Sequence, residues 1–380
     1  MDEQIYTNYR LQLPDEEVVG TLVVRDGLIA DIQPDVTFTG QDGQGDYLMP
    51  GLIELHTDNL ERCMSPRPGI QWPMESAVVF HDKQLVSAGV TTVFDAIALG
   101  DVFPSSLRMT QFGGMINALH QGQIVGRFAA DHRLHLRCEV SYKDVVSITE
   151  EYIDNPLLSL ISLMDHTPGQ RQFVNIEKYK QYYTGKHGVP ASEIDAFIHQ
   201  RQLEQQQYGE KNTATLVQLV KSKKVKVAIA SHDDATTAHV QEAVESGAMI
   251  AEFPTTLEAA AEAHKQGLKI LMGAPNIVLG QSHSGNISAM ELVQRNQVDI
   301  FSSDYAPHSL LQAVFNIAKK MAKPLYQSIK LVTTNPAQAV NLFHDRGSLE
   351  VGKRADLITV HDDRVVPRLT SVIVQGRRVA

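Results

Sequence analysis

The sequence has few cysteines and no long apolar run, and both absences narrow the class of protein. Its 380 residues contain two cysteines, Cys63 and Cys138, which give no disulfide framework. No apolar stretch approaches the ~18–20 residues of a membrane span, and the N-terminal MDEQIYTNYR lacks the apolar core of a signal peptide. We therefore expect a cytoplasmic protein with no membrane partner.

An excess of positive charge is also missing. The formal net charge is −10, and the Lys and Arg residues form no basic stripe. Binding to nucleic acid is therefore not expected. A polyanionic small molecule stays compatible with this charge where Arg and Lys cluster locally or where metal ions are bound. Histidine, in contrast, is abundant, with 15 residues.

Both ends of the chain are rich in β-strand signals. Residues 18–32 read as two short strands joined by Asp26-Gly27, a strong hairpin signal between apolar runs. The stretch 354–379 is again rich in β-formers, with turn residues at 362–363 and 375–376. The two ends therefore predict one small β-domain composed of residues 1–50 and 346–380.

The segment between them, 51–345, alternates short apolar runs with segments of helical period. The predicted strands are 51–56, 90–95, 132–139, 158–165, 225–231, 248–253, 269–272 and 299–303. Repeated βα units imply a parallel sheet with both faces covered. Eight such strands favour a closed (β/α)₈ barrel over an open sheet, and a barrel of ~250 residues fits the length.

One polar segment, 171–212, interrupts this alternation and is rich in Gln, Tyr and Lys. It can form exposed helices on the rim of the barrel. Alternatively it serves as a lid or a subunit contact, since long insertions in βα loops often have such roles.

Ionisable residues stand where the predicted strands end, and in a barrel of this kind the functional groups occupy those ends. Six of them form the candidate metal site: His56, Asp58, Glu139, His166, His232 and Asp304. A single strand-end His or Asp is more often a hydrogen-bonding group or a helix cap, and Asp233 or Asp234 can be such a cap. The presence of His, Asp or Glu at the ends of several strands at once favours a metal site.

The pair His56 and Asp58 is the most informative local pattern. Residues two apart in a strand point to the same side, so both side chains can reach one ion. Imidazole and carboxylate together suit zinc, and also manganese or iron.

These motifs resemble the amidohydrolase superfamily. The resemblance rests on HTD after the first strand, single His residues after two later strands and SSDYAP after the last strand. NPAQAV at 335–340 and RGSLEVGKRADL at 346–357 add to it. The resemblance implies a metal-dependent hydrolase whose barrel is combined with a β-sandwich built from both termini. It also implies that Asp304 binds metal and accepts the proton of the attacking water.

The chain departs from the usual pattern of that superfamily at two points. It has His-x-Asp where most members have His-x-His, and no Lys stands at the strand end where many members carry a metal-bridging carboxylated Lys. Glu139 is the nearest substitute. If Glu139 bridges, two divalent ions bind, with zinc preferred and manganese, iron or magnesium as alternatives. If Glu139 pairs with Arg137 instead, the site holds one ion.

Longer strings resemble one branch of the superfamily, the diphosphatases of the carbon–phosphorus lyase pathway. They include PGLIELHTDNLE, SPRPGIQWP, DHTPGQRQF and GAPNIV followed by SHSGN. The resemblance implies a phosphorylated ribose phosphonate as substrate, with a 5-triphosphate cleaved to a 5-phosphate and pyrophosphate. The residues expected to bind this substrate are Arg67, His81, Arg137, Arg171, Asn276 and His283.

A different substrate class stays open. The same centre can hydrolyse a cyclic amide, an N-acyl amino sugar or an aminopurine, and the charge of the pocket distinguishes the two possibilities. A triphosphate needs several converging cationic groups, whereas a cyclic amide does not. We also expect the chain to form a homo-oligomer.

Overall fold

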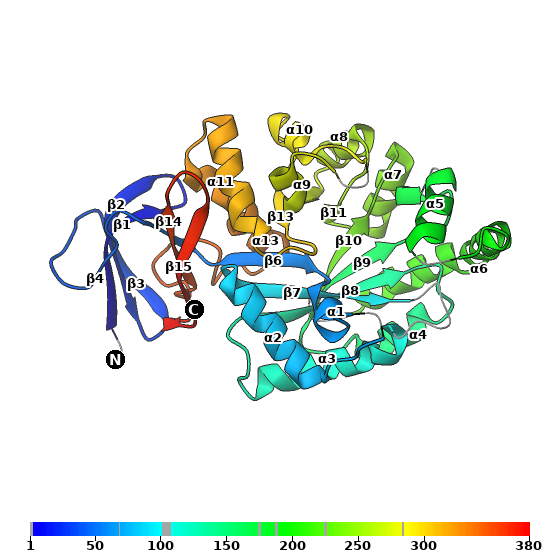
Figure 1. Ribbon diagram of the computed structural model, residues 1–380, viewed down its shortest axis with the longest axis horizontal. Helices are drawn as coiled ribbons and strands as arrows, with labels where there is room; N and C mark the ends of the chain where they lie inside the picture. Colours follow the sequence, from blue (N-terminus) through cyan, green and yellow to red (C-terminus); the bar gives the residue numbers. More distant parts are fainter. Residues whose placement is uncertain are drawn as a thin grey trace. The chain divides into compact units, whose positions relative to one another are not determined.

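A computed structural model describes residues 3–67, 69–100, 108–173, 176–186, 189–223, 226–282 and 285–380. The described strands form two separate sheets of eight strands each. Helices connect the strands of the second sheet and lie outside them (Figure 1). No described helix is long and apolar enough to cross a membrane.

The first sheet is a mixed sheet assembled from both ends of the chain. Its strands follow the order β16-β15-β14-β5-β1-β2-β3, with β4 paired to β1. Their bounds are β1 Glu3–Gln12, β2 Glu17–Arg25, β3 Leu28–Gln33, β4 Gln41–Asp42, β5 Tyr47–Pro50, β14 Leu357–Asp362, β15 Pro367–Val374 and β16 Arg377–Arg378. Leu11, Leu22, Leu48 and Leu357 are fully buried in its core, which joins strands from the two ends.

The predicted hairpin joins β2 and β3. Asp26 and Gly27 both have positive φ, at 51° and 81°, as expected for a two-residue turn that matches the twist of its strands. A Cβ on Gly27 would lie 2.9 Å from the carbonyl oxygen of Gln375. Glycine is therefore required here for its conformation and for a close approach of backbone.

The second sheet is a nearly closed parallel barrel, so the predicted fold class is confirmed. Its strands neighbour one another in chain order from β6 to β13. Their bounds are β6 Leu52–Thr57, β7 Val90–Leu99, β8 Asp131–Glu139, β9 Leu158–Met164, β10 Ala228–His232, β11 Ile250–Glu252, β12 Lys269–Gly273 and β13 Ile300–Ser302. A parallel bridge between Thr57 and Asp304 brings the end of β6 to the end of β13.

The eight strands match the eight predicted ones, with differences at their ends. Strand β7 continues to Leu99, because the apolar residues after Asp95 stay buried in the sheet. Strand β10 begins at Ala228, later than the predicted 225. The helices after β10 and β11 begin where Thr236 and Thr256 accept a hydrogen bond from the backbone N–H three residues on, a usual helix cap.

Most helices connect consecutive barrel strands or follow the last one. Their bounds are α1 Asn59–Met64, α2 Met74–Ser87, α3 Arg108–Ile124, α4 Val145–Tyr152, α5 Ile176–Lys186, α6 Ile194–Lys221, α7 Thr237–Ser246, α8 Leu257–Lys265, α9 Ala274–Leu279, α10 Ala289–Gln294, α11 Ser309–Met321, α12 Leu325–Ile329 and α13 Thr334–Ala339. Short 3₁₀ turns span Arg171–Phe173 and Lys330–Val332.

By its internal packing the chain divides into two compact units. The first comprises Met1–Asp95, Asn117–Arg133 and Met272–Ala380, and the second comprises Ala96–Ile116 and Leu134–Leu271. Strands β7, β8 and β12 each have residues in both units. The predicted division into 1–50 with 346–380 and 51–345 stays a prediction.

The polar segment 171–212 forms α5 and most of α6 in the second unit. A small apolar cluster joins Phe173, Tyr179 and Tyr183 to Ile194 and Ile198, so the segment has a core of its own. The side-chain amide of Asn212 on α6 donates to the carbonyl oxygens of Val140 and Tyr142, both at 3.0 Å. Helix α6 is thereby fixed to the turn that follows β8.

Candidate active site

Glu139 and His166 form a contact at the ends of β8 and β9. Nδ1 of His166 lies 2.8 Å from Oε2 of Glu139, and the Ser141 hydroxyl donates to Oε1 at 2.8 Å. Burial alone would raise the pKa of Glu139, but these hydrogen bonds hold it below its ordinary value. Since a carboxylate accepts, Nδ1 donates, and Nε2 is the ring nitrogen left to serve as a ligand. Burial would lower the pKa of His166, but the hydrogen bond to Glu139 and its charge raise it above the ordinary value.

His232 is oriented in the same way at the ends of β10 and β11. The register of these strands sets His232 opposite Glu252, and Nδ1 lies 3.2 Å from Oε2 of that carboxylate. Burial lowers the pKa of His232 below its ordinary value. A neutral imidazole whose Nδ1 donates to a carboxylate is the form that ligates a metal through Nε2.

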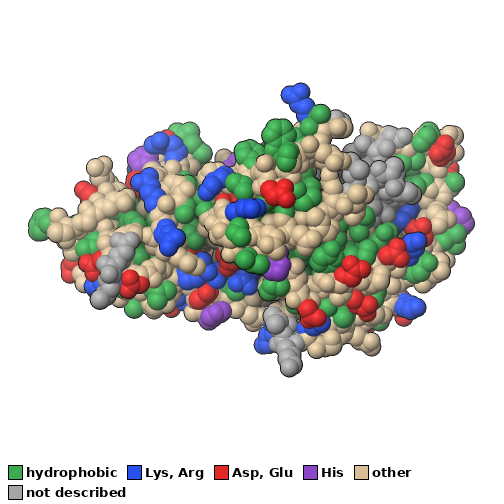
Figure 2. Space-filling model, turned by 90° about the horizontal axis from the view of Figure 1, so that it is seen from below, with side chains coloured by type: hydrophobic (Ala, Val, Ile, Leu, Met, Phe, Trp, Pro, Cys, Tyr) green, Lys and Arg blue, Asp and Glu red, His purple; other side chains and the backbone are tan. Residues whose placement is uncertain are grey.

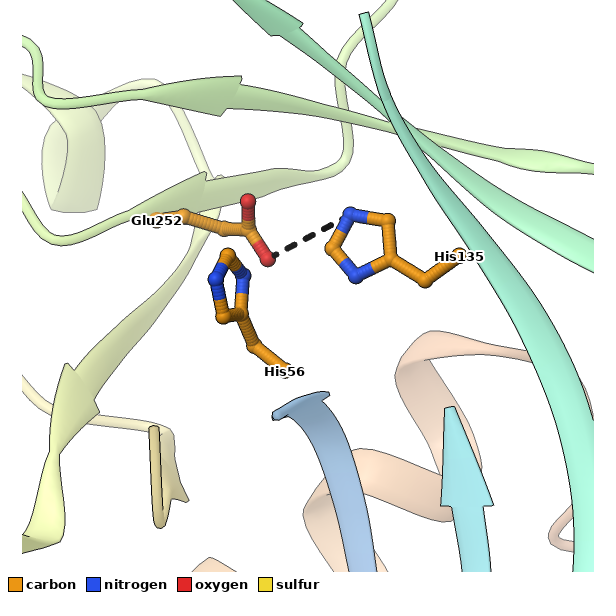
Figure 3. A group of neighbouring side chains, drawn as sticks. All are labelled: His56, His135 and Glu252. Carbon is orange, nitrogen blue, oxygen red and sulfur yellow. Dashed lines mark ion pairs between the residues drawn. The ribbon is translucent and has the colours of Figure 1, made fainter. Parts of the chain in front are cut away.

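Glu252 also contacts His135, which lies on β8. Nε2 of His135 is 3.9 Å from Oε1 of Glu252, and the Ser162 hydroxyl lies between the two side chains, hydrogen-bonded to both. Figure 3 shows this pair, with the ion pair dashed, and also draws His56. His135, Ser162 and Glu252 are all fully buried, so β8, β9 and β11 are linked by polar groups in the interior.

Asp233 completes a set of possible ligand atoms in the second unit. Its Oδ2 lies 3.5 Å from Nε2 of His232 and 3.9 Å from Nε2 of His166. Ligand atoms of the three residues all lie within 4.8 Å of one another. Asp233 has φ of 56°, a costly conformation for a residue other than glycine, of the kind that concentrates at functional sites.

Arg137 lies on the same strand as Glu139 and carries a polar atom that lacks an acceptor. Its Nε is buried and has no hydrogen-bond partner among the described residues. Its positive charge acts on both His166 and His232 and opposes their protonation. A buried donor left unpaired costs about 1–3 kcal/mol, so an anionic ligand would relieve it.

In the first unit, a buried carboxylate ties β6 to β13. Glu54 accepts hydrogen bonds from the backbone N–H of His56 at 2.7 Å and from that of Ser303 at 2.6 Å. The Ser302 hydroxyl donates to it as well. Burial raises the pKa of Glu54. These bonds fix the backbone on either side of His56 and immediately before Asp304.

Asp58 and Asp304 stand at the ends of these two strands. The Thr57 hydroxyl donates to the carbonyl oxygen of Asp304 at 2.9 Å, and Asp304 has φ of 54°. Asp58 precedes α1, yet its side chain does not cap that helix. Its Oδ1 is buried and has no hydrogen-bond partner among the described residues.

These two groups fit divalent cations. The second unit presents two imidazole Nε2 atoms with a carboxylate. In the first unit, Asp58 carries a buried carboxylate oxygen that has no hydrogen-bond partner among the described residues. Nitrogen and carboxylate ligands of this kind suit zinc and its neighbours. A bound cation would offset the cost of burying the Asp58 oxygen without a hydrogen-bond donor.

Comparisons with known proteins agree with this chemistry. The amidohydrolase family model matches residues 188–380. The chain is 45% identical to the alpha-D-ribose 1-methylphosphonate 5-triphosphate diphosphatase of Escherichia coli strain K12, over 99% of this chain and 100% of that protein. The chain belongs to the amidohydrolase family. This amidohydrolase is therefore an enzyme of the hydrolase class.

Other relatives are more distant. An adenine deaminase of Methanosphaera stadtmanae is 30% identical over 37% of this amidohydrolase and 25% of that protein. The solved N-acetylglucosamine-6-phosphate deacetylase of Pasteurella multocida has a TM-score of 0.64 at 14% identity, covering 100% of both chains. A molinate hydrolase has a TM-score of 0.67 at 14% identity, covering 100% of this chain and 94% of that one. These two structures support the fold.

Two of the residues predicted to bind substrate have partners within the amidohydrolase itself. Arg171 contacts Asp234 through Nη1, and Nη2 lies 3.5 Å from Glu242. Burial raises the pKa of Asp234 to about 6, although Arg171 acts against that rise. Asn276 accepts from the N–H of Ala289 at 3.1 Å and donates to the carbonyl oxygen of Ile287 at 3.3 Å. Both side chains therefore hold loops in place.

The other predicted contacts differ in their surroundings. Arg67 is exposed in the loop after α1. His81 is fully buried, and its Nε2 is 2.6 Å from Oδ1 of Asp95, so a direct contact with substrate would require this pair to open. His283 lies outside the described residues. Among the described members of this set, Arg137 has a buried Nε and His81 a buried Nδ1 that lack a hydrogen-bond partner.

The sequence did not lead us to Glu54, Glu252 or Asp233 as members of the site. Glu54 and Glu252 lie inside short apolar runs, and that placement is the signal that could have revealed them, since an unpaired carboxylate is costly in a core. Asp233 stands in the string SHDD, a placement that also fits a helix cap.

Proposed function

We propose that this amidohydrolase is a metal-dependent diphosphatase of phosphonate catabolism. It would hydrolyse alpha-D-ribose 1-methylphosphonate 5-triphosphate to the 5-phosphate and pyrophosphate. The full-length 45% identity to the E. coli diphosphatase supports this substrate. The structural observation that carries the proposal is the buried Nε of Arg137, which has no acceptor among the described residues and whose charge acts on His166 and His232. A phosphoryl oxygen would supply that acceptor.

We further propose that the amidohydrolase holds two divalent ions, zinc in the first instance. The proposed ligands are His56, Asp58, Glu139, His166, His232 and Asp304, with Asp233 as an additional candidate. All of them stand at or just beyond the C-terminal ends of parallel barrel strands, where enzymes with this fold carry their functional groups. The contact of Glu139 with His166 also suits a role in orienting that imidazole.

The reaction adds one water across the anhydride between the first and second phosphorus atoms of the triphosphate. A new bond forms between the water oxygen and phosphorus, and the bond to the bridging oxygen breaks. Asp304 accepts the proton of the water, and Arg137 binds phosphoryl oxygens through its planar guanidinium. Divalent ions, when bound, would neutralise phosphoryl charge and make the attacking water more acidic.

The test offers the purified, metal-loaded amidohydrolase three substrates: the ribose 1-methylphosphonate 5-triphosphate, ATP and adenine. Pyrophosphate, phosphate and ammonia are measured in each case. The proposal expects pyrophosphate from the first substrate at the highest kcat/KM. Release of ammonia from adenine with no pyrophosphate from the triphosphate would contradict the proposal and indicate a deaminase instead.

A cytoplasmic location and a homo-oligomeric state stay predictions.

A further inference from the structure

A cavity rich in arginine lies in the first unit, away from the ligand groups described above. It has a volume of about 1040 Å³ and lies among the β2–β3 hairpin, the segment between α3 and β8, and the β15–β16 hairpin. The cationic residues that line it are Lys83, Arg127, Arg133, Arg346, Arg354 and Arg377. Its acidic lining residues are Asp26 and Asp131. Asp131 begins β8, whereas Glu139 ends that strand.

Arg346 and Arg354 form a fixed base for the cavity. Arg346 lies 2.5 Å from Asp131 through Nη1 and 2.8 Å from Asp345 through Nε. Arg354 lies 2.9 Å from Asp356. Both guanidinium groups are therefore neutralised by buried or half-buried carboxylates and hold their orientation.

The remaining arginines of the cavity are less well neutralised. Arg133 shares Asp131 with the two arginines of the base, at 3.3 Å through Nη2, and its buried Nε has no hydrogen-bond partner among the described residues. Arg127 and Arg377 are exposed, and within the described chain neither has an ion-pair partner. Lys83 is 3.7 Å from Asp82 and is more than half exposed.

This arrangement is unusual for a chain with a net charge of −10. Seen from below, Lys and Arg side chains gather left of centre, with some Asp and Glu among them (Figure 2). Several guanidinium groups around one cavity repel one another, and a bound polyanion would offset that repulsion. The planar guanidinium fork can bind two oxygens of a phosphate group at once.

We propose that this cavity is a second anion site, which binds a small phosphate-type oxyanion through Arg127, Arg133 and Arg377. The partly exposed guanidinium of Arg133 would donate to the oxyanion from the wall of the cavity, and the exposed Arg127 and Arg377 would bind it from the rim. Free phosphate and pyrophosphate share this chemistry. Because the site is separate from the candidate catalytic residues, it is independent of the proposed function.

The test is calorimetric titration of the full-length, metal-loaded protein with sodium phosphate and, separately, sodium pyrophosphate. The double variant Arg127→Ala/Arg377→Ala removes the rim and should weaken binding of at least one of the anions by about tenfold or more. Arg364→Ala/Arg368→Ala, an equal charge change at exposed positions outside the cavity, is the matched control and should bind like the unmodified protein. The single variant Arg133→Gln should show the same loss as the double variant.

Comparison of the two dissociation constants tells whether the cavity binds phosphate or pyrophosphate more tightly. Anion binding at the candidate catalytic residues would persist in every variant. The predicted loss therefore concerns only the binding event at the cavity. Titrations of the double variant that superimpose on those of the unmodified protein would overturn the proposal. An equal loss of binding in the control variant would also overturn the proposal, because the loss would then follow from the change in net charge alone.

Discussion

The imidazole rings of His166 and His232 are each held through Nδ1 by a glutamate, Glu139 and Glu252 respectively. This fixes which ring nitrogen can serve as a ligand, because a carboxylate accepts the Nδ1 proton. Arg137, on the same strand as Glu139, keeps a buried donor without an acceptor. At the scale of single residues, the candidate ligands His166 and His232 are therefore already oriented, and Arg137 beside them could bind an anion.

The Arg137→Ala variant should weaken binding of the triphosphate. A hydrogen bond to a charged group contributes about 1.5–3 kcal/mol, so KM should rise roughly 10- to 100-fold. Arg295→Ala is the matched control, since Arg295 is half exposed and pairs with Glu291 on α10. Steady-state kinetics of pyrophosphate release would decide, and an unchanged KM in Arg137→Ala would remove this residue from the binding site.

The Glu252→Gln variant should weaken metal binding while it leaves the strand in place. Glutamine lacks the charged carboxylate that accepts the hydrogen bond from Nδ1 of His232. Loss of such an orienting group costs about 10- to 100-fold in metal affinity. Competition titration with a chelator measures that affinity. Glu245→Gln, an exposed position on α7, should bind metal as the unmodified protein does. Equal affinity in both variants would contradict the orienting role.

At the scale of elements, the strands were predictable and the interior carboxylates were not. Apolar runs followed by a polar residue mark where a barrel strand ends, which is how His56, His166, His232 and Asp304 could be found. Glu252 lies in the three-residue strand β11, too short to show a period. The contact of Glu139 with His166 depends on the packing of β8 against β9, which residue spacing does not specify.

Helix α6 reaches the site through a chain of hydrogen bonds. Nη2 of Arg201 donates to the Ser141 hydroxyl at 3.0 Å, and that hydroxyl donates to Glu139. The polar insertion therefore positions a candidate ligand. Its proposed use as a lid or a subunit contact stays a prediction.

The Arg201→Ala variant should lower kcat by about tenfold, because Ser141 and then Glu139 lose their orientation. Arg201→Lys should recover part of the activity, since the amine can still donate to Ser141. Gln200→Ala, an exposed neighbour on α6, is the control. The decisive readout is kcat at saturating metal together with the unfolding midpoint. A fall in stability with kcat unchanged would assign Arg201 a structural role alone.

A second element-scale network joins α2, β7 and β8 through His81, Asp95 and His132. Nδ1 of His132 lies 2.7 Å from Asp95 and its Nε2 lies 3.3 Å from Asp82. Burial alone would lower the pKa of His132, but these carboxylates raise it from 6.5 to about 9. His132 is therefore positively charged in the folded protein at neutral pH.

Stability should accordingly fall in mildly alkaline solution. The folded pKa lies above the unfolded value, so the stabilisation is complete below about 6.5 and is lost as pH rises through about 9. Urea midpoints on either side of pH 9 would measure the loss. The His132→Asn variant should be less stable at neutral pH and show a shallower decline, whereas His344→Asn, at an exposed position, should decline like the unmodified protein. A flat profile in the unmodified protein would refute a charged His132.

At the scale of the whole molecule, the candidate ligands come from both compact units. His56, Asp58 and Asp304 belong to the first, and Glu139, His166 and His232 belong to the second. Within each unit, the parallel order of the strands brings these strand-end residues to one edge. The family model and the full-length relative assign the chain to the amidohydrolases, and the proposed substrate depends on that relative and on Arg137.

The most direct test of the account is a metal titration of pyrophosphate release by the amidohydrolase after its metals have been removed with a chelator. The account predicts no release from ribose 1-methylphosphonate 5-triphosphate without metal, and recovery that saturates at about two divalent ions per chain. The Asp304→Asn variant should bind at least one ion and stay inactive. Full pyrophosphate release by metal-free protein, or by Asp304→Asn, would contradict the account.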